Sequence, residues 1–573
     1  MLSDTITKSA PVYFGPGNRL FGWLHSNPTG ARRTPVIICP PLGFEFVRAY
    51  RAVRTLARKL AGTGHITLRF DYAGTGDSHE YDQDSDAVTS WIDSICSAID
   101  YVMSLTGSES VVLVGIRLGG TLASKVAQLR EIHSLVLWEP AESGKTYCRE
   151  MQMIEAGTKS TRDVQKYPGI DAAGFYLTTK TIDGVKELIL GQSPFIGRPR
   201  ILLLERDDIA LNERRASQLE MSGSELKRQS ISDYKAMMLA PQEARVPEQS
   251  IELIAGWLSE TCSPNAASDE ERGGIDFTNC SETVLPCRGT VETAIQFGPE
   301  NRLFGILTQS REGTSPSGPT VILLTGGAVP HFSTNRMYVP LARRLASRGR
   351  TVLRMSFSGI GDSDPSPGGP SSVAYTATSN EDLQSALDML TEKTGVKRFT
   401  LFGFCSGAYA AMKFARTSDR VERLILANQL VYFLSDEDLV RLANGELRSA
   451  SSLDFPRSKT AASRTLRKLL RNLGRSGALI GELFQRDLVG GSLGAELRAL
   501  SARGIQLSFI QSQDDPAQDA LLLPARRTIA KMLRSSAARL VTIPASDHNF
   551  SSVQSQERLF LCIDEILGER RQR

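Results

Sequence analysis

The feature that most constrains the fold of this chain is an internal repeat. Phe14–Gly22 reads FGPGNRLFG, and Phe297–Gly305 reads FGPENRLFG. Each copy is followed by a β-rich run, a helical stretch and a strand that closes in a glycine turn, LRFDYAGTGDS at Leu68–Ser78 and LRMSFSGIGDS at Leu353–Ser363. Because these landmarks recur in the same order at a nearly constant spacing, the chain is predicted to contain two copies of one fold.

Each half alternates short, β-branched strands with helical stretches. This alternation predicts a mostly parallel sheet flanked by helices in each half. Between the halves, Ser263–Arg288 is polar, rich in Gly and Ser, and lacks a helical period, which is typical of a linker. The predicted organisation is therefore a first domain over 1–262, a linker over 263–288 and a second domain over 289–573.

One sharp turn occurs in both halves, but only one copy carries a nucleophile. In the second half, an apolar strand runs into Gly403-Phe-Cys405-Ser-Gly407. This is the nucleophile elbow of the α/β-hydrolase fold, G-x-C-x-G, with cysteine at its apex. The first-half copy, SVVLVGIRLG, has Arg117 at the apex, and a guanidinium cannot attack a carbonyl. The sequence predicts two tandem α/β-hydrolase domains, of which the first is inactive.

The second half also supplies an acid and a base in the order that this fold uses. His548 follows a predicted strand and precedes the final helix, and Asp515 follows the preceding predicted strand. Asp515 is favoured because it stands directly before a proline, and Asp514 is the alternative. With Cys405 they give the order nucleophile, acid, base, which predicts a catalytic triad. A small, buried, unreactive thiol is the alternative role for Cys405.

Two backbone N–H groups are predicted to form an oxyanion hole. One belongs to Ser406, which follows the nucleophile, and the other to Ala328 in the loop after the third predicted strand. Ser406 is the alternative nucleophile, but the register opposes it because only the central elbow residue projects above the sheet. His331, the other histidine of this half, is a candidate for substrate binding.

The first half has no residue for the base, since no histidine occurs between His133 and His331. Arg117 is a candidate to bind a carboxylate or phosphate of the substrate at the top of the sheet. The alternative is a structural ion pair between Arg117 and Asp208 or Glu205, and the sequence does not decide between the two.

A cysteine nucleophile points to acyl chemistry. Its acyl-enzyme is a thioester, which is open to attack by amines, thiols and alcohols as well as water. The leading hypothesis is an enzyme acting on an ester or thioester, as a thioesterase, an acyltransferase or an esterase. The substrates of such an enzyme include acyl groups linked to a carrier protein or to CoA. The alternative from another class is a non-catalytic scaffold in a biosynthetic complex.

The second half inserts a long segment between the strand Arg423–Ala427 and Gly504, where this fold usually carries its cap. Within it, Arg457–Arg475 places leucines at helical spacing among basic residues. This stretch is predicted to be a cap helix whose leucines cover the active site. The alternative is a dock for an acidic partner such as an acyl carrier protein, a CoA phosphate, an anionic glycan or a membrane surface.

Composition narrows the remaining function classes. The net charge of +4 gives no reason to expect nucleic acid, and the eight cysteines have neither disulfide-framework nor metal-type spacing. No metal or nucleotide cofactor is predicted, because the GxG turns continue into Asp-Ser instead of a dinucleotide fingerprint. The start has no signal-peptide pattern and no run reaches the length of a transmembrane helix, so a cytoplasmic protein is predicted. The oligomeric state is not predicted.

Several of these motifs carry a family resemblance. With its GxGDS turn, its G-x-C elbow and LILANQ at Leu424–Gln429, the second half resembles the exosortase A system-associated hydrolase of type 1. With PPLGFE, RFDYAGTGDS and GIRLGG, the first half resembles the type 2 companion and serine-aminopeptidase-like proteins, which often carry arginine at the elbow. The chain departs from the type 1 elbow at Ser406-Gly407, which follow the cysteine. The resemblance implies a role in bacterial exopolysaccharide or acyl-product biosynthesis.

Overall fold

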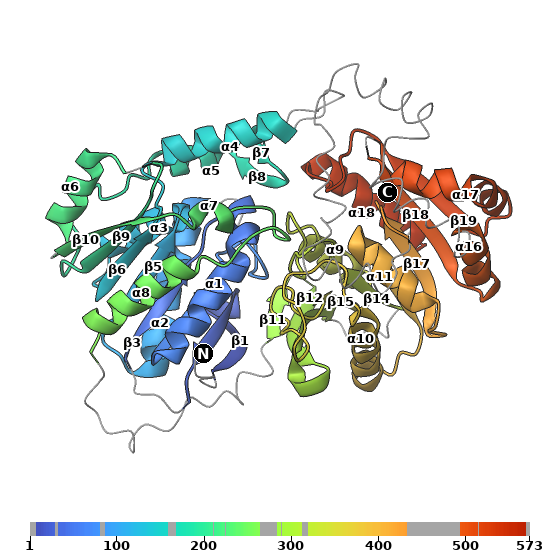
Figure 1. Ribbon diagram of the computed structural model, residues 1–573, viewed down its shortest axis with the longest axis horizontal. Helices are drawn as coiled ribbons and strands as arrows, with labels where there is room; N and C mark the ends of the chain where they lie inside the picture. Colours follow the sequence, from blue (N-terminus) through green and yellow to red (C-terminus); the bar gives the residue numbers. More distant parts are fainter. Residues whose placement is uncertain are drawn as a thin grey trace.

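The chain folds into two β-sheets, each covered by helices, that lie side by side along the long axis of the molecule (Figure 1). The computed structural model describes residues 7–28, 33–80, 86–158, 168–209, 211–223, 225–263, 284–287, 289–311, 319–432, 493–513 and 515–568. The predicted fold class, two tandem α/β-hydrolase domains, is confirmed. The expected cap helix at Arg457–Arg475 and the alternative acid Asp514 lie outside the described residues.

The first half contains an eight-stranded sheet with the order β1-β2-β4-β3-β5-β6-β9-β10. β2 runs antiparallel to both of its neighbours, and all later pairs are parallel. The strands are β1 (Lys8–Phe14), β2 (Leu20–Ser26), β3 (Arg33–Cys39), β4 (His65–Phe70), β5 (Val112–Ile116), β6 (Ser134–Trp138), β9 (Arg200–Arg206) and β10 (Glu225–Ile231), with a separate hairpin of β7 (Gly169–Ala172) and β8 (Phe175–Thr178). The helices are α1 (Phe44–Gly62), α2 (Ala87–Thr106), α3 (Leu118–Ala127), α4 (Gly144–Thr158), α5 (Thr179–Lys186), α6 (Glu213–Ser222), α7 (Tyr234–Met237) and α8 (Glu248–Thr261), with a 3-10 turn η1 (Pro16–Asn18).

The second half repeats this order behind one extra strand: β11-β12-β13-β15-β14-β16-β17-β18-β19. Its first three pairs are antiparallel and the rest are parallel. The strands are β11 (Val284–Cys287), β12 (Thr290–Phe297), β13 (Leu303–Ser310), β14 (Thr320–Leu324), β15 (Val352–Ser356), β16 (Phe399–Phe404), β17 (Val421–Ala427), β18 (Gln506–Ser512) and β19 (Ala538–Ile543). The helices are α9 (Tyr338–Ala346), α10 (Ser379–Thr394), α11 (Ser406–Ala415), α16 (Leu493–Ala502), α17 (Ala517–Arg534) and α18 (Val553–Ile566), with a 3-10 turn η3 (Pro299–Asn301).

The extra strand β11 lies inside the segment predicted as a linker. It pairs antiparallel with β12, and it buries Leu285 and Cys287. VLPC is a short run without charged residues, and its second and fourth side chains enter the core, as the alternation of a strand requires. The second sheet therefore begins before residue 289, the predicted start of the second domain.

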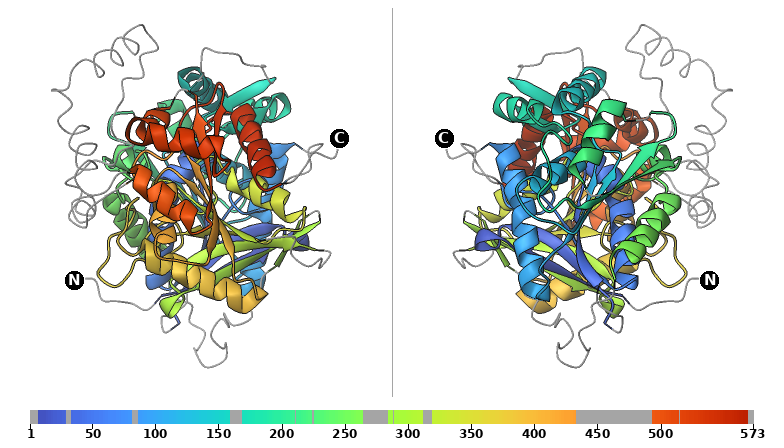
Figure 2. Two further views of the ribbon diagram at one scale, coloured as in Figure 1. Left: turned by 90° about the vertical axis from the view of Figure 1, so that its right-hand side faces the viewer. Right: turned by 90° about the vertical axis from the view of Figure 1, so that its left-hand side faces the viewer.

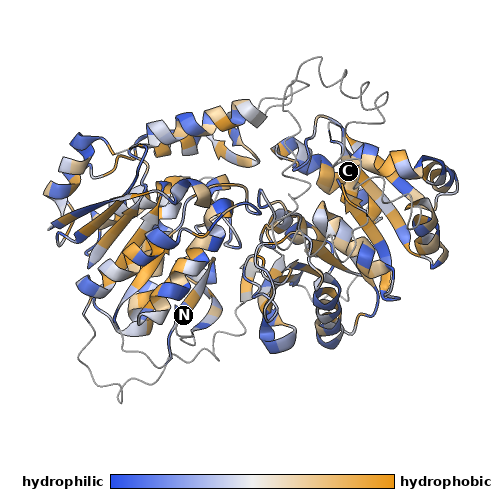
Figure 3. Ribbon diagram, in the orientation of Figure 1, coloured by the Kyte–Doolittle hydropathy of each residue, from blue (hydrophilic) through white to orange (hydrophobic). Residues whose placement is uncertain are grey.

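Both faces of each sheet are buried. Side chains alternate along β3, so Ile37 packs toward α2 and α3 while Val36 and Ile38 pack toward α1 and α8. In the second half, Ile322 and Val321 divide between two faces in the same way. Figure 3 shows the result as apolar strands inside helices whose outer surfaces are hydrophilic, and Figure 2 shows the helices from both ends of the molecule. Burial on both faces is what mostly parallel sheets require.

The two halves share buried apolar surface. One interface cluster joins β1 and β2 to the edge of the second sheet, and in it Trp23 packs edge-on against Phe304 with ring centroids 4.8 Å apart. A second cluster joins α1 to the second half, where Phe46 stacks on Phe332 at 5.5 Å. The halves are therefore fixed against each other by cores that neither half completes alone.

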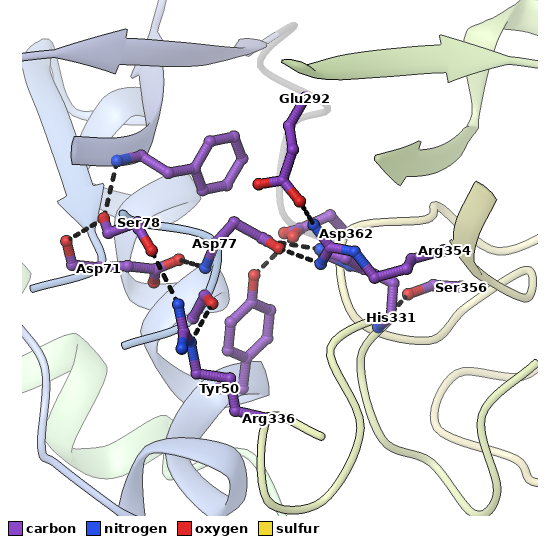
Figure 4. Close-up of polar contacts among 12 residues, drawn as sticks. Tyr50, Asp71, Asp77, Ser78, Glu292, His331, Arg336, Arg354, Ser356 and Asp362 are labelled. Atoms are coloured by element: carbon purple, nitrogen blue, oxygen red, sulfur yellow. Dashed lines mark hydrogen bonds and ion pairs between the residues drawn. The ribbon is translucent and has the colours of Figure 1, made fainter. Parts of the chain in front are cut away.

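Charged side chains cross the same interface in a reciprocal exchange, of which Figure 4 shows the pair of Arg354 and Asp77. Arg69 of the first half binds Asp362 of the second, with Nη2 to Oδ1 at 2.5 Å. Arg354 of the second half binds Asp77 of the first, with Nη1 to Oδ1 at 2.5 Å. The two arginines occupy equivalent positions in the repeat, and so do the two aspartates. The repeated halves thus meet as a self-complementary pair, in the manner of an isologous dimer interface.

This exchange explains the repeated GxGDS turns. In each turn the serine hydroxyl accepts a hydrogen bond from the antiparallel strand, Ser78 from the Phe21 N–H and Ser363 from the Phe304 N–H. The serine fixes the turn to its own sheet, and the preceding aspartate reaches across to the other half. The motif therefore serves the interface between the halves.

Candidate active site

Cys405 stands at the apex of a strained turn between β16 and α11. Its backbone φ is 52°, in the left-handed region that residues with a Cβ rarely adopt. A Cβ on Gly403 would lie 2.5 Å from the Ala408 Cα, and one on Gly407 would lie 2.4 Å from the Leu324 carbonyl oxygen. Only glycine fits at these two positions, which is why the sequence reads G-x-C-x-G. The turn places Cys405 at the carboxyl edge of the parallel strands.

The predicted acid and base lie together at the same edge. His548 Nδ1 is 2.6 Å from Asp515 Oδ2, and the Asp515 carboxylate is almost fully buried while the imidazole is 23% exposed. Asp515 follows β18 and His548 follows β19, the two last strands of the sheet. Asn428, which follows β17, donates from Nδ2 to the His548 carbonyl at 2.8 Å and to Ser512 Oγ at 2.9 Å. The ends of three neighbouring strands are thereby held in one arrangement.

Cys405 interacts with both His548 and Tyr375. Burial alone would lower the pKa of His548, but the negative charge of a Cys405 thiolate and hydrogen bonds to Asp515 and Cys405 raise this pKa well above its ordinary value. Burial raises the pKa of Tyr375, and the neighbouring Cys405, to which the tyrosine is hydrogen-bonded, raises it further. The raised pKa suits His548 to take a proton from a neighbouring thiol, which is the role of the base beside a nucleophilic cysteine.

The loop after β14 packs directly on the elbow. A Cβ on Gly326 would lie 2.8 Å from the Cys405 Cβ, so this residue has to be glycine. The Gly327 N–H donates to the Ser406 hydroxyl at 2.8 Å, which occupies that hydroxyl away from the apex. Within the described part of the chain, the Ser406 and Ala328 N–H groups have no hydrogen-bond acceptor. An oxyanion hole needs donors that are free in this way.

The first half has the same turn, but a charged arginine stands at its apex. Arg117 has a φ of 53° between β5 and α3, so it occupies the position of the nucleophile. Its Nε donates to Glu45 Oε1 at 2.8 Å, and its Nη2 donates to Glu150. Burial would lower the pKa of Arg117, but the Glu45 and Glu150 carboxylates and the nearby Tyr234 raise it above its ordinary value. Arg117 is a partnered structural cation in place of a nucleophile.

The ion pair expected for Arg117 therefore exists, but the predicted partners were wrong. Asp208 pairs with Arg206 at 2.8 Å and with Lys235 at 2.8 Å, and Glu205 pairs with Arg228 at 2.8 Å. Glu45 was missed because it lies far from the elbow in sequence, at the start of α1.

His331 belongs to the interface between the halves and has no exposed surface to offer a substrate. It is fully buried, and its Nε2 lies 2.5 Å from Asp77 Oδ2 (Figure 4). Burial raises the pKa of Asp77, but His331 and Arg354 lower it more, so it lies well below its ordinary value. The substrate-binding role predicted for His331 is corrected to an interface role.

A hairpin from the first half reaches the elements that position His548. The carboxylate of Asp171, a residue of β7, accepts a hydrogen bond at 3.1 Å from the N–H of Val553 at the start of α18. A Cβ on Gly174 would lie 2.7 Å from the Asn335 Cβ, and Asn335 Nδ2 donates to the Phe550 carbonyl at 3.0 Å. Figure 1 shows α4, β7 and β8 extending from the first half toward α18. The first half therefore contributes to the surroundings of the candidate site.

The sequence motifs did not identify Asn428 or Tyr375 as part of the site. Asn428 has a φ of 46° and is fully buried, which marks a strand end held under constraint. Its signal was the LILANQ stretch, in which two polar residues end an apolar strand. Tyr375 comes from a loop between β15 and α10 and carried no periodic or motif signal.

Among the described residues, no group of three or more His, Cys, Asp and Glu side chains is placed to hold a metal ion. Across the same residues, no helix has both the length and the hydropathy that membrane crossing requires.

Part of the second half matches a known family, and the chain is similar to several solved structures. Residues 319–497 match the family described as the alpha/beta hydrolase fold. A search of curated proteins found no match. Solved structures similar to this chain include Est1E from Butyrivibrio proteoclasticus with bound ferulic acid, which is 18% identical over 42% of this chain and 93% of that protein, with a TM-score of 0.31. They also include a thermophilic esterase from Thermogutta terrifontis, 18% identical over 48% of this chain and 98% of that protein, with a TM-score of 0.29.

Proposed function

We propose that the chain cleaves esters or thioesters through a covalent acyl-enzyme on Cys405. The observation that carries this proposal is the 2.6 Å contact between His548 Nδ1 and Asp515 Oδ2, with Cys405 near enough to the same imidazole to raise its pKa. A nucleophile, a base that can take its proton and a group that orients the base are the three parts of a triad.

The first half-reaction follows from this geometry. Asp515 Oδ2 accepts a hydrogen bond from the Nδ1–H of His548, so Nε2 is the nitrogen free to take the thiol proton of Cys405. The sulfur attacks the carbonyl carbon, and the oxyanion that forms is stabilised by the Ser406 and Ala328 N–H groups. Collapse breaks the bond to the leaving group, which takes the proton from His548. The product is a Cys405 thioester.

The second half-reaction decides between hydrolysis and transfer. His548 removes a proton from water or from an acceptor amine, alcohol or thiol, which then attacks the thioester and releases Cys405. Since a thioester is more reactive toward amines and thiols than an oxygen ester, transfer is as accessible as hydrolysis here. Carrier-protein- and CoA-linked thioesters belong to the donors that this chemistry accepts.

We assign the first half, residues 1–262, a non-catalytic role. The Arg117–Glu45–Glu150 cluster occupies its elbow, and the β7–β8 hairpin reaches the second half at Val553. The first half then shapes the entrance to the site of the second domain, residues 289–573, across the linker at 263–288. The resemblance of both halves to exosortase A system-associated hydrolases favours a cytoplasmic step in bacterial exopolysaccharide or acyl-product biosynthesis.

Steady-state turnover of p-nitrophenyl acetate and of an acetyl thioester tests the proposal. Cys405→Ala is expected to lower kcat by about a thousandfold or more, because the covalent route is removed. Cys96→Ala, which removes a partly exposed thiol on α2, is the matched control and is expected to keep wild-type turnover. Equal loss in both variants, or turnover that survives Cys405→Ala, would favour the scaffold alternative.

A further inference from the structure

A cavity of about 510 Å³ lies between the two halves, and we call it the interdomain cavity. The first half lines it with side chains of α1 and α8, and the second half lines it with residues from the loops after β14 and β15. Its volume falls in the range of small-molecule binding sites. Pockets at domain interfaces are a common place for such sites.

One wall of the interdomain cavity is strongly basic. Helix α1 supplies five cations to the lining. Four recur every three or four residues and so share one face, Arg48, Arg51, Arg54 and Arg58, and Lys59 follows directly after Arg58. The lining contains two acidic residues, both from α8, and one of them is already paired, Glu252 with Lys59 at 2.6 Å. The lining therefore has an excess of positive charge.

The α1 arginines differ in the carboxylates and carbonyls that their guanidinium groups bind. Arg54 and Arg58 share the single carboxylate of Asp364, at 2.8 Å and 2.9 Å. Arg54 also donates to the carbonyls of Gly361 and Ser363, so it has a structural role at the interface. The Arg58 Nε is buried without a hydrogen-bond acceptor in the described part of the chain. Two guanidinium groups on one carboxylate leave a net positive charge.

Among the α1 arginines that line the cavity, Arg51 is the one whose guanidinium has no protein partner within the described residues. The other three bind carbonyls or carboxylates. The pKa of Arg51 is lowered by burial alone, with no carboxylate acting in the opposite direction. A half-buried guanidinium without an acceptor is costly, since its five N–H donors are left unused. A ligand with acceptor oxygens would remove that cost.

The interdomain cavity adjoins the candidate active site. Its lining includes Ala328, the predicted oxyanion donor. Ala328 lies two residues after Gly326, the glycine that packs on Cys405. The lining also includes Ser371 and Ser372, which lead into Tyr375, the tyrosine hydrogen-bonded to Cys405. Ala328 is therefore shared by the oxyanion hole proposed above and by the wall of the interdomain cavity.

We propose that the interdomain cavity binds an anionic group of the acyl substrate, a phosphate or a carboxylate, through Arg51. The planar guanidinium fork matches either oxyanion and binds it through paired N–H donors. This inference rests on the proposed function for the identity of the ligand, but anion binding itself does not depend on catalysis. The first half thereby supplies a specificity site to the catalytic second half.

Arginine-selective labelling tests the binding site without turnover. The wild-type chain is treated with phenylglyoxal, and the modified arginines are mapped by peptide mass spectrometry. Arg51 is expected to be labelled, and millimolar inorganic phosphate or succinate is expected to slow that labelling several-fold. Protection by phosphate alone identifies a phosphoryl ligand, and protection by succinate alone identifies a carboxylate. The exposed Arg526 is the internal control, and its labelling should not respond to either anion. Unlabelled Arg51, or labelling that neither anion slows, overturns the proposal.

Matched donors then test the link to the substrate. Acetyl-pantetheine and acetyl-4′-phosphopantetheine carry the same thioester and differ by one phosphate, and p-nitrophenyl butyrate and mono-p-nitrophenyl glutarate differ by one carboxylate. In Arg51→Gln, the preference in kcat/KM for the anionic member is expected to fall about 10- to 100-fold, the worth of a charge-assisted hydrogen bond. In Arg526→Gln the preference should stay at the wild-type value. Equal preference in wild type and Arg51→Gln overturns the proposal, whereas no turnover of any donor contradicts the proposed function and leaves the labelling result standing.

Discussion

Replacing Arg69 by methionine removes one of the two charges exchanged across the interface. The side chains of Arg69 and Asp362 are 6% and 0% exposed, and their atoms meet at 2.5 Å. Methionine keeps much of the volume but leaves the Asp362 carboxylate with the Tyr50 hydroxyl as its side-chain donor within the described residues. Breaking a buried ion pair by removing one partner costs about 3–5 kcal/mol. We therefore expect Arg69→Met to lower the free energy of unfolding by about that amount.

The loss of unfolding free energy in Arg69→Met should depend on pH in a defined direction. Burial raises the pKa of Asp362, but Arg69 and Arg54 lower it more, so it lies below its ordinary value. The stabilisation from this pair is complete above the ordinary pKa of about 3.9 and is lost as the pH falls toward the lowered one. The difference between wild type and Arg69→Met should shrink over that acidic range.

Guanidinium unfolding followed by tryptophan fluorescence measures the effect, since Trp23 lies in the same interface. Arg130→Met is the matched control, because Arg130 pairs with Asp100 at the surface with side chains 37% and 64% exposed. Exposed pairs contribute about 0–1 kcal/mol. Adding Asp362→Asn to Arg69→Met should recover part of the loss, because the unpaired charge is then gone. A loss no larger than that of Arg130→Met, or no recovery in the double variant, would refute the reasoning.

Three further predictions concern the site. Cys405→Ala should lower the pKa of His548 as followed by NMR of the imidazole, because the thiolate is a cause of its elevation; an unchanged pKa would mean that the two groups are not coupled. Gly407→Ala should abolish activity and destabilise the second half by about 1–3 kcal/mol in thermal unfolding, because its Cβ would lie 2.4 Å from the Leu324 carbonyl oxygen; wild-type Tm and activity would contradict this. Asn428→Ala should reduce kcat more than it raises KM, because Asn428 holds the strand ends and does not reach the substrate; a change confined to KM would count against that role.

The sequence predicted the parts of the site that rest on local chemistry. Cys405 at the apex is implied by two glycines that admit no Cβ, and this requirement is written in consecutive residues. His548 and Asp515 could be placed because parallel strands end at one edge, so the fold brings their following residues together. The two domains followed from the repeat alone.

What the sequence could not supply was the arrangement between the halves. Nothing in either copy shows that Asp77 and Asp362 leave their own halves, since each also stands beside a serine that stays within its own sheet. The partners of Arg117 were missed for the same reason, because Glu45 reaches it through the packing of α1. Contacts between residues far apart in the chain depend on how elements pack, and hydrophobic period and turn residues carry no record of that.

The most direct test of the central claim is the mass of the protein after rapid quenching of a reaction with an acetyl thioester. A single acetyl addition is expected, mapped to the peptide that contains Cys405. It should disappear in Cys405→Ala and form more slowly in His548→Ala, which lacks the base of the first half-reaction. Acetyl groups absent from Cys405 while the wild-type protein turns over the same donor would contradict covalent catalysis at this cysteine.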